Sequence, residues 1–325
     1  MTVKLDSAPG RSCPLRYRYG PSAIARMPLV STETLYVVGG LYGNVEALEV
    51  IERLAAAETG RVRVCFNGDF NWFNVDDESY HAINSRVLQY DALLGNVEAE
   101  LGADGDEAGC GCAYPDSVSA EVVERSNRIH AHLKFTASSH PPLTARLAAL
   151  PMFARYLVGN CRVGIVHGDA ESLAGWRFSR AELENPLSQA WLSQVFEQAD
   201  VDVFASSHTC EPAIKYVEKL NALHKTTGLH QSAFAGVVIN NGAAGMPNDT
   251  SALSGCITRI SQTPFQCQSV PQAKIIEKTS FAGTEIAAIS VPYNHEKWCA
   301  RFLANWPEGS DAYLSYYARI SGGCL

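Results

Sequence analysis

Four short polar motifs of this chain contain side chains that can bind a metal ion. They are Gly68-Asp69, Gly95-Asn96, His167-Gly168 and Ser207-His208. Each follows an apolar run of strand-forming residues, so we expect each motif at the carboxyl end of a strand, where open α/β sheets bind their ligands. One carboxylate, one amide oxygen and two imidazoles suit a divalent transition metal. The sequence therefore predicts a metal site built from strand ends.

The elements that position these motifs alternate between strands and helices in the first third of the chain. Apolar runs that favour strands are separated by segments whose apolar residues recur at helical spacing. The predicted order is strand 35–38, helix 44–57, strand 62–66, helix 76–90 and strand 92–94. Asn44 is a suitable N-cap for the first helix. This βαβαβ order implies a parallel sheet.

The rest of the chain is less regular. Residues 99–117 contain many Gly and Asp residues and are expected to form a loop. Helices are expected at about 118–133 and 143–150, and strands at 152–158, 161–166, 201–205, 237–240, 256–262 and 284–293. We expect a single domain over 1–325, with an N-terminal arm (1–33), a loop and helical insertion (99–150) and a C-terminal tail (296–325) packed on the core. The aromatic residues of that tail, from Trp298 to Tyr317, are expected to cover the edge of the domain.

Composition and charge narrow the functional classes. The 325 residues carry a net charge of −8, which argues against a nucleic-acid polymer as partner but not against a small phosphorylated substrate. No run approaches the ~20 apolar residues of a membrane span, and the first 20 residues lack the apolar core of a signal peptide. The ten cysteines show no C-x-x-C pair. We therefore expect reduced thiols and a cytoplasmic location, and leave the oligomeric state open.

In their order and spacing, the motifs resemble the calcineurin-like metallophosphoesterases over about residues 34–250. The pattern of that family is D-x-H, G-D, G-N-H-[DE], a lone His, and G-H-x-H. The resemblance implies the α/β fold class, in the form of a four-layer αββα sandwich of two mixed sheets flanked by helices. The late strands would then supply part of the second sheet. It also implies metal ions bound between the sheets.

The resemblance transfers only part of the family's ligand set. Asp69 matches the bridging aspartate, Asn96 the amide ligand, His167 the lone histidine and His208 the first histidine of G-H-x-H. These four are the complete protein ligands of one of the two metals. The ligands of the other metal are replaced, with Gly40, Tyr42 and Cys210 at their positions, and Val97 replaces the histidine that acts as an acid. This pattern favours one divalent transition metal (Zn, Mn or Fe) over two.

The implied function is hydrolysis of a small phosphomonoester or phosphodiester by a metal-activated water. Asn96 and His208 would serve catalysis as well as metal binding. An alternative is a catalytically inactive descendant that binds a phosphorylated ligand or a protein partner. A third is a site remodelled around Cys210 for another reaction.

Several residues near the motifs have two interpretations each. Cys210 is either a further metal ligand, as a thiolate, or a small buried residue. Tyr42 and Asn44 are candidates for substrate binding, and packing or capping is the alternative. Arg177 either clamps a phosphate or lies on the surface.

Two segments of the predicted insertion also leave alternatives open. The loop from Gly109 to Cys112 either folds over the site or faces solvent. Arg125 and Arg128 are expected on a solvated helix face.

Overall fold

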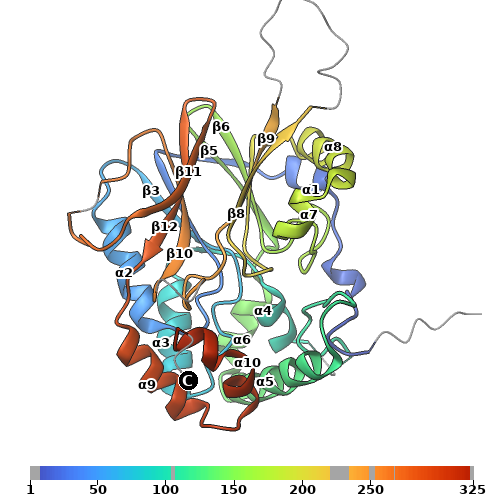
Figure 1. The fold of residues 1–325 in the computed structure, drawn as a ribbon, viewed down its shortest axis with the longest axis vertical. Helices are drawn as coiled ribbons and strands as arrows, with labels where there is room; N and C mark the ends of the chain where they lie inside the picture. The colour runs from blue at the N-terminus through green and yellow to red at the C-terminus, as the bar shows by residue number, and fades with distance from the viewer. Residues whose placement is uncertain (1–7, 104–106, 220–233, 249–252, 267, 323–325) are drawn as a thin grey trace, which may run out of the picture.

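The computed structural model describes residues 8–103, 107–219, 234–248, 253–266 and 268–322. It contains two six-stranded sheets that pack face to face, with helices on their outer sides (Figure 1). The strand orders are β11-β12-β10-β2-β3-β4 in one sheet and β1-β5-β6-β7-β9-β8 in the other. Both sheets mix parallel and antiparallel pairs. The predicted four-layer αββα sandwich is confirmed.

The strands of each sheet come from both halves of the chain. The first sheet contains β2 (Thr34–Val38), β3 (Val62–Phe66), β4 (Asp91–Ala92), β10 (Gly255–Ser261), β11 (Ile275–Phe281) and β12 (Thr284–Val291). The second contains β1 (Leu29–Thr32), β5 (Phe153–Val158), β6 (Cys161–Val166), β7 (Val203–Ser206), β8 (Ala213–Glu218) and β9 (Phe234–Asn240). Strands β2, β3 and β4 are parallel, as are β6, β7 and β9, so their carboxyl ends point to the same end of the sandwich.

The helices form three groups (Figure 1). The first sheet is flanked by α2 (Val45–Ala56), α3 (Asp77–Val87) and α9 (His295–Asn305). The second is flanked by α1 (Pro21–Ala25), α7 (Arg180–Glu184) and α8 (Gln189–Ala199), with short 3₁₀ turns at Leu15–Tyr17 and Pro186–Ser188. The third group lies at the lower end in Figure 1 and contains α4 (Asn96–Leu101), α5 (Ala120–Ser138), α6 (Pro141–Ala148) and α10 (Asp311–Ile320). We call this third group the cap.

Helix α2 illustrates how the sequence specifies these elements. The side chain of Asn44 accepts a hydrogen bond from the N–H of Ala47 and so caps the helix, as predicted. The apolar face predicted for this segment is buried, including Leu48, Ile51 and Leu54. Burial of each such side chain stabilises the fold by roughly 1.5–3 kcal/mol.

The core between the sheets is built from the inner faces of central strands. Leu35 and Val37 of β2 pack in one buried cluster with Val163 and Ile165 of β6 and with Ile239 of β9. Because side chains alternate across a strand, the adjacent residues Tyr36 and Val38 point to the helices on the outer face. This fixes the register of both sheets and therefore the places at which their strands end.

One prediction about the organisation is wrong, and the arm and the tail contain more regular structure than expected. The late strands β10 and β12 join β2–β4 in the first sheet and not the second sheet, because β10 pairs with β2. The predicted arm is partly strand, since β1 pairs in parallel with β5 at the edge of the second sheet. The tail forms two helices, and α10 belongs to the cap rather than to the edge of the sandwich.

Local structure also differs from the prediction in three places. The loop expected over 99–117 begins only after α4, a helix that starts at Asn96 itself. Strands β8 and β11 were not expected, because each carries many polar and exposed residues at the edge of its sheet. The remaining predicted helices and strands agree with the structure to within a few residues.

Two general features bear on the environment of the chain. None of the helices in the described residues is both long and apolar enough to cross a membrane. The eight cysteines in the described residues are all free thiols: Cys13, Cys65, Cys110, Cys112, Cys161, Cys210, Cys256 and Cys299.

Candidate metal centre

The structure brings together the four side chains predicted to bind a metal. Asp69 follows β3 and His167 follows β6 directly, while His208 lies two residues after β7. Asn96 is the first residue of α4, shortly after β4. All four are buried, and they lie near the carboxyl ends of β3, β4, β6 and β7.

Nε2 of His167 lies at the centre of this cluster. It is 3.4 Å from Oδ1 of Asp69, 3.1 Å from Oδ1 of Asn96 and 3.2 Å from Nδ1 of His208. Ligand atoms of Asp69, His167 and His208 all lie within 4.8 Å of one another. These separations suit side chains that share one ion.

The hydrogen bonds around the cluster leave only lone pairs to face its centre. Nδ1 of His167 donates to the main-chain oxygen of Asn67 (2.8 Å), so its Nε2 carries a lone pair. Nε2 of His208 donates to the main-chain oxygen of Cys112 (3.1 Å), so its Nδ1 also carries a lone pair. Nδ2 of Asn96 donates to the oxygen of Cys110 (2.9 Å) and directs Oδ1 inward. Oδ1 of Asp69 also accepts the N–H of Val97 (3.2 Å), and a cation at the centre would relieve the repulsion among these acceptor atoms.

The electrostatics of the cluster also suit a metal. Burial raises the pKa of Asp69, but the neighbouring His167 and His208 outweigh this and lower it, so the carboxylate is ionised. Burial and the neighbouring His167 lower the pKa of His208 to about 3, which keeps its ring neutral. Burial lowers the pKa of His167, but Asp69 outweighs burial and raises it. Asp69 and His208 are therefore in the forms that bind metals, whereas a metal would have to compete with a proton for His167.

The loop that carries Asp69 is held by Glu98, a buried carboxylate for which the sequence suggested no role. Its Oε2 accepts the N–H of Asp69 (2.8 Å), and its Oε1 accepts the N–H groups of Phe70 (3.1 Å) and Asn71 (3.2 Å). These bonds hold Asp69 at φ 56°, a conformation uncommon for residues other than glycine. A side chain at Gly95 would lie only 2.2 Å from Oδ1 of Asp69, so glycine is needed there.

The residues at the positions of the second metal do not fit a metal. The Tyr42 hydroxyl lies 2.6 Å from Sγ of Cys210, and Cys210 is not part of the metal-binding group. The Tyr42 ring also occupies the space where a side chain at Gly40 would lie, 2.9 Å from the position of its Cβ. Burial raises the pKa of both Tyr42 and Cys210, although the positive charge of Arg319 opposes the rise. A neutral phenol and a neutral thiol are poor ligands.

A cavity of about 530 Å³ lies over the cluster and reaches Asp69, Asn96 and His208. Its walls come from segments far apart in the sequence. Residues that line it include Tyr42, Trp72, Val97, Cys112, Tyr114, Arg125, Trp176, Cys210, Tyr316 and Arg319. Its volume is that of a small-molecule site.

The other predicted site residues divide between the cavity and positions away from it. Tyr42 and Cys210 line the cavity, whereas Asn44 and Arg177 do not. Asn44 uses its side chain to cap α2 and to donate to the main-chain oxygen of Gly245 (2.8 Å). Arg177 packs over the ring of Trp191, 3.9 Å from its centroid, and lies 3.6 Å from the carboxylate of Glu171.

The structure also shows where the loop from Gly109 to Cys112, the arginines of α5 and the aromatic residues of the tail lie relative to the site. The loop from Gly109 to Cys112 folds over the site, because its main-chain oxygens accept from Asn96 and His208. Arg128 lies on a solvated face, as predicted, but Arg125 lines the cavity. Tyr316 of the tail also lines it, although the aromatic residues of the tail were expected to cover the edge of the domain. The positions of this loop, of Arg125 and of Tyr316 depend on how the cap packs against the two sheets. The spacing of apolar residues in the sequence does not predict that packing.

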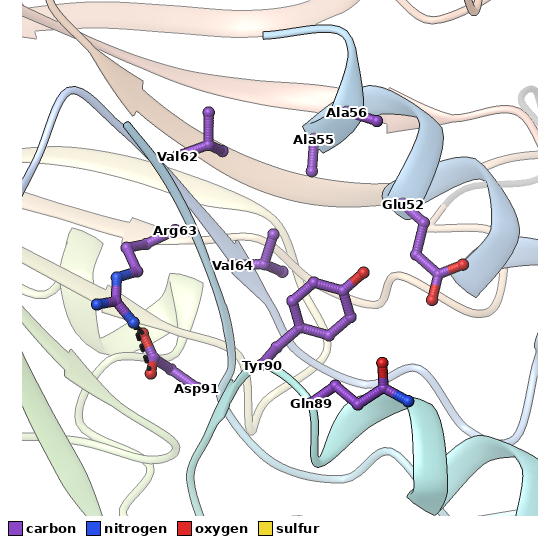
Figure 2. A pocket seen from close by; sticks show the side chains of 9 residues that line it. All are labelled: Glu52, Ala55, Ala56, Val62, Arg63, Val64, Gln89, Tyr90 and Asp91. Carbon is purple, nitrogen blue, oxygen red and sulfur yellow. Dashed lines mark hydrogen bonds and ion pairs between the residues drawn. The ribbon is translucent and has the colours of Figure 1, made fainter. Parts of the chain in front are cut away.

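A second cavity, of about 490 Å³, lies away from this cluster (Figure 2). It is lined by residues of α2, of β3 and of the segment from Gln89 to Asp91. Its arginine, Arg63, is already paired with Asp91 at 3.4 Å, and Tyr90 points across the opening. Asp69 and His208 line the first cavity, and none of the residues that line the second belongs to the group that could hold a metal ion.

Comparisons with known proteins agree with this geometry at the level of the fold. No protein-family model matches the sequence. No curated protein shows significant similarity to it. The structure is similar to that of a metallophosphoesterase from Sphaerobacter thermophilus, with a TM-score of 0.51 and 16% identity over 90% of this chain and 100% of that chain.

A hypothetical protein from Pyrococcus horikoshii OT3 is similar to the same extent, with a TM-score of 0.52 and 14% identity. That alignment covers 86% of this chain and 97% of the other. At such identities the likeness concerns the fold, which extends over almost the whole chain. The chain therefore has the metallophosphoesterase fold, with a group of residues at its strand ends that can hold a metal ion.

Proposed function

We propose that the chain is a metal-dependent hydrolase of small phosphate esters. One divalent transition metal (Zn, Mn or Fe) would be held by Asp69, Asn96, His167 and His208. The observation that supports this proposal is the convergence of Oδ1 of Asp69, Oδ1 of Asn96, Nε2 of His167 and Nδ1 of His208, with the side chains of Asn96, His167 and His208 each oriented by a main-chain oxygen. The open cavity above them gives a small substrate access to the same atoms.

The residues of the chain would orient the reactants and hold charge. A bound metal lowers the pKa of a coordinated water and polarises a phosphoryl oxygen. The N–H of Val97 donates to Oδ1 of Asp69 (3.2 Å), and the Glu98 carboxylate fixes the loop of Asp69, so this ligand is in place before substrate arrives. His208 and Asn96 are held by the main chain of Cys112 and Cys110, and lie at the floor of the cavity.

Two features of the site favour the alternative of a binding protein without turnover. Val97 has no proton to give to a leaving group, and the Tyr42–Cys210 pair replaces the second metal. Two-metal sites stabilise both the attacking and the leaving oxygen. A one-metal site without an acid would therefore be slow except on esters with good leaving groups.

Metal analysis and a substrate panel test the proposal. The chain purified with zinc, manganese or ferrous iron should contain about one metal ion, and a chelator should lower its melting temperature, because the metal binds the folded state. The loaded protein should hydrolyse some of a panel of phosphomonoesters and phosphodiesters. A protein that binds one metal but hydrolyses no ester in the panel supports the binding alternative. If the protein binds no metal, the site is not a metal centre, and neither the hydrolase nor the metal-containing binding protein is correct.

A further inference from the structure

The cavity over the metal centre contains an arginine with no carboxylate partner among the described residues. Arg319, near the end of α10, donates from Nε to the main-chain oxygen of Pro247 (2.6 Å). Its Nη2 donates to the main-chain oxygen of Cys210 (3.1 Å) and lies 3.4 Å from Oδ1 of Asn248. These acceptors are all uncharged. Arg125, the other arginine of the cavity, is paired with Glu121. Arg319 therefore brings a positive charge into the cavity that is in contact with no carboxylate of the described residues, although Asp69 and Glu211 also line the cavity.

The position of this charge is fixed at the Tyr42–Cys210 side of the metal centre. The hydrogen bond to Cys210 holds the guanidinium there, and its charge reaches both side chains of the pair. Nη1 makes no hydrogen bond with the described part of the chain, so it remains available to a ligand. The N–H groups of Nη1 can donate to a phosphoryl oxygen, and hydrogen bonds from a charged donor are stronger than those between neutral groups.

The remaining wall of the cavity is rich in aromatic rings. Trp72, Tyr114, Trp176 and Tyr316 all line it. They form two close pairs, with ring centroids 6.4 Å apart for Trp72 and Tyr316 and 5.9 Å apart for Tyr114 and Trp176. Aromatic side chains bind planar apolar groups through their faces and edges. A ligand with an aromatic group and an anionic group could therefore contact the aromatic rings and Arg319 at the same time.

We propose that this cavity binds an aromatic phosphate monoester, with its phosphoryl oxygens on Arg319 and its ring against Trp72, Tyr114, Trp176 and Tyr316. The inference rests on the proposed function and names its substrate class. A monoester carries close to two negative charges at neutral pH, so both the metal and Arg319 have a charge to bind. A phenol, with a pKa of about 10, is also a better leaving group than an alkyl alcohol. That suits a site where Val97 cannot donate a proton.

Binding of two phosphonates, which have no ester bond to cleave, tests this inference. Calorimetry on the full chain loaded with zinc should show phenylphosphonate binding at least about tenfold more tightly than propylphosphonate. Arg319→Gln should weaken both by about tenfold or more, because a charged hydrogen bond is lost. Tyr316→Leu should weaken only phenylphosphonate. Two control variants should leave the affinity for both phosphonates unchanged. Arg53→Gln removes an exposed arginine of α2, and Tyr313→Leu changes a tyrosine that lies on α10, like Tyr316, but outside the cavity.

Each other outcome counts against the inference. Equal affinity for the two phosphonates overturns the aromatic class, and unchanged binding by Arg319→Gln overturns the role of the arginine. Thermal melting shows whether each variant is folded. If Arg319→Gln does not fold, Arg319→Lys keeps the charge but cannot keep the hydrogen bonds to Pro247 and Cys210 while it also donates to a ligand, and should bind both phosphonates several-fold more weakly.

The proposed function is tested separately, by hydrolysis of phenyl phosphate. Turnover without a preference for aromatic ligands would overturn only the inference about substrate class. Aromatic binding that depends on Arg319, without turnover of any ester, would overturn only the hydrolase.

Discussion

Nε2 of His167 and Nδ1 of His208 lie 3.2 Å apart, and the main chain sets this distance. The N–H groups of Ser207 and His208 both donate to the main-chain oxygen of His167, which continues the parallel pairing of β6 and β7 beyond the ends of the strands. Each ring is then oriented by a main-chain oxygen on its outer nitrogen. The two imidazoles are thus preorganised by the sheet, and a metal need not draw them together.

Loss of either a carboxylate or an imidazole ligand should abolish metal binding. We expect Asp69→Asn and His208→Ala to reduce the metal content from about one ion per chain to a small fraction, because no neighbouring side chain can replace the lost ligand. Asparagine tolerates the positive φ at position 69, so that variant should still fold. Elemental analysis after dialysis provides the measurement. His81→Ala, at an exposed histidine of α3, is the control and should keep its metal. Full occupancy in His208→Ala would exclude this centre.

The fold could be predicted largely from local patterns. The strand leading to Asp69 and the helix capped by Asn44 have clear periodicity and turn residues, and both form as predicted. The pairing of the late strands could not be predicted, because β10 lies between β2 and β12 through contacts distant in sequence. Edge strands such as β11 lack an apolar alternation that would mark them.

The centre of the site could be predicted better than its walls. The four central residues lie in local turns at or near the ends of strands, so their sequence motifs predict that their side chains come together. They are Asp69, Asn96, His167 and His208. The wall residue Arg319 arrives through the docking of a C-terminal helix, which depends on packing between distant segments. The placement of Arg177 outside the cavity follows from its packing on Trp191, which sequence spacing does not reveal.

Cys210 should prove dispensable for metal binding. Its Sγ lies 2.6 Å from the hydroxyl of Tyr42, outside the group formed by Asp69, His167 and His208. We therefore expect Cys210→Ser to retain about one metal ion per chain, whereas a thiolate ligand would be expected to give a clear loss. Zinc titration with a competing chelator gives the affinity. A drop of tenfold or more in that affinity would restore the thiolate to the ligand set.

Buried His130 should make stability depend on pH. Burial lowers the pKa of this histidine. Its Nε2–H donates a hydrogen bond to the main-chain oxygen of Val97 (3.1 Å). A base with a lowered pKa in the folded state stabilises the fold above the pKa of the unfolded state, about 6.5, and this contribution is lost as the pH falls. The folded chain should therefore lose stability from pH 7.5 to pH 5.

The matched variant for this test is His130→Gln, which keeps a donor for Val97 but does not titrate. The free energy of unfolding in urea should fall more steeply with decreasing pH for the original chain than for the variant. Parallel curves for the two proteins would contradict the assignment of a neutral, buried imidazole.

Val97→His should shift the preference of the proposed hydrolase toward poor leaving groups. Val97 is 1% exposed and lines the cavity beside Asp69, so an imidazole there would place a proton donor near the departing oxygen. Because Val97 is no ligand, metal content should not change. The larger side chain should cost about 1–3 kcal/mol of stability through overpacking. We expect the ratio of turnover on alkyl phosphates to turnover on aryl phosphates to rise by about tenfold or more. Val97→Leu adds volume without a proton donor, and the same rise in that variant would show that the change in shape, and not acid catalysis, is responsible.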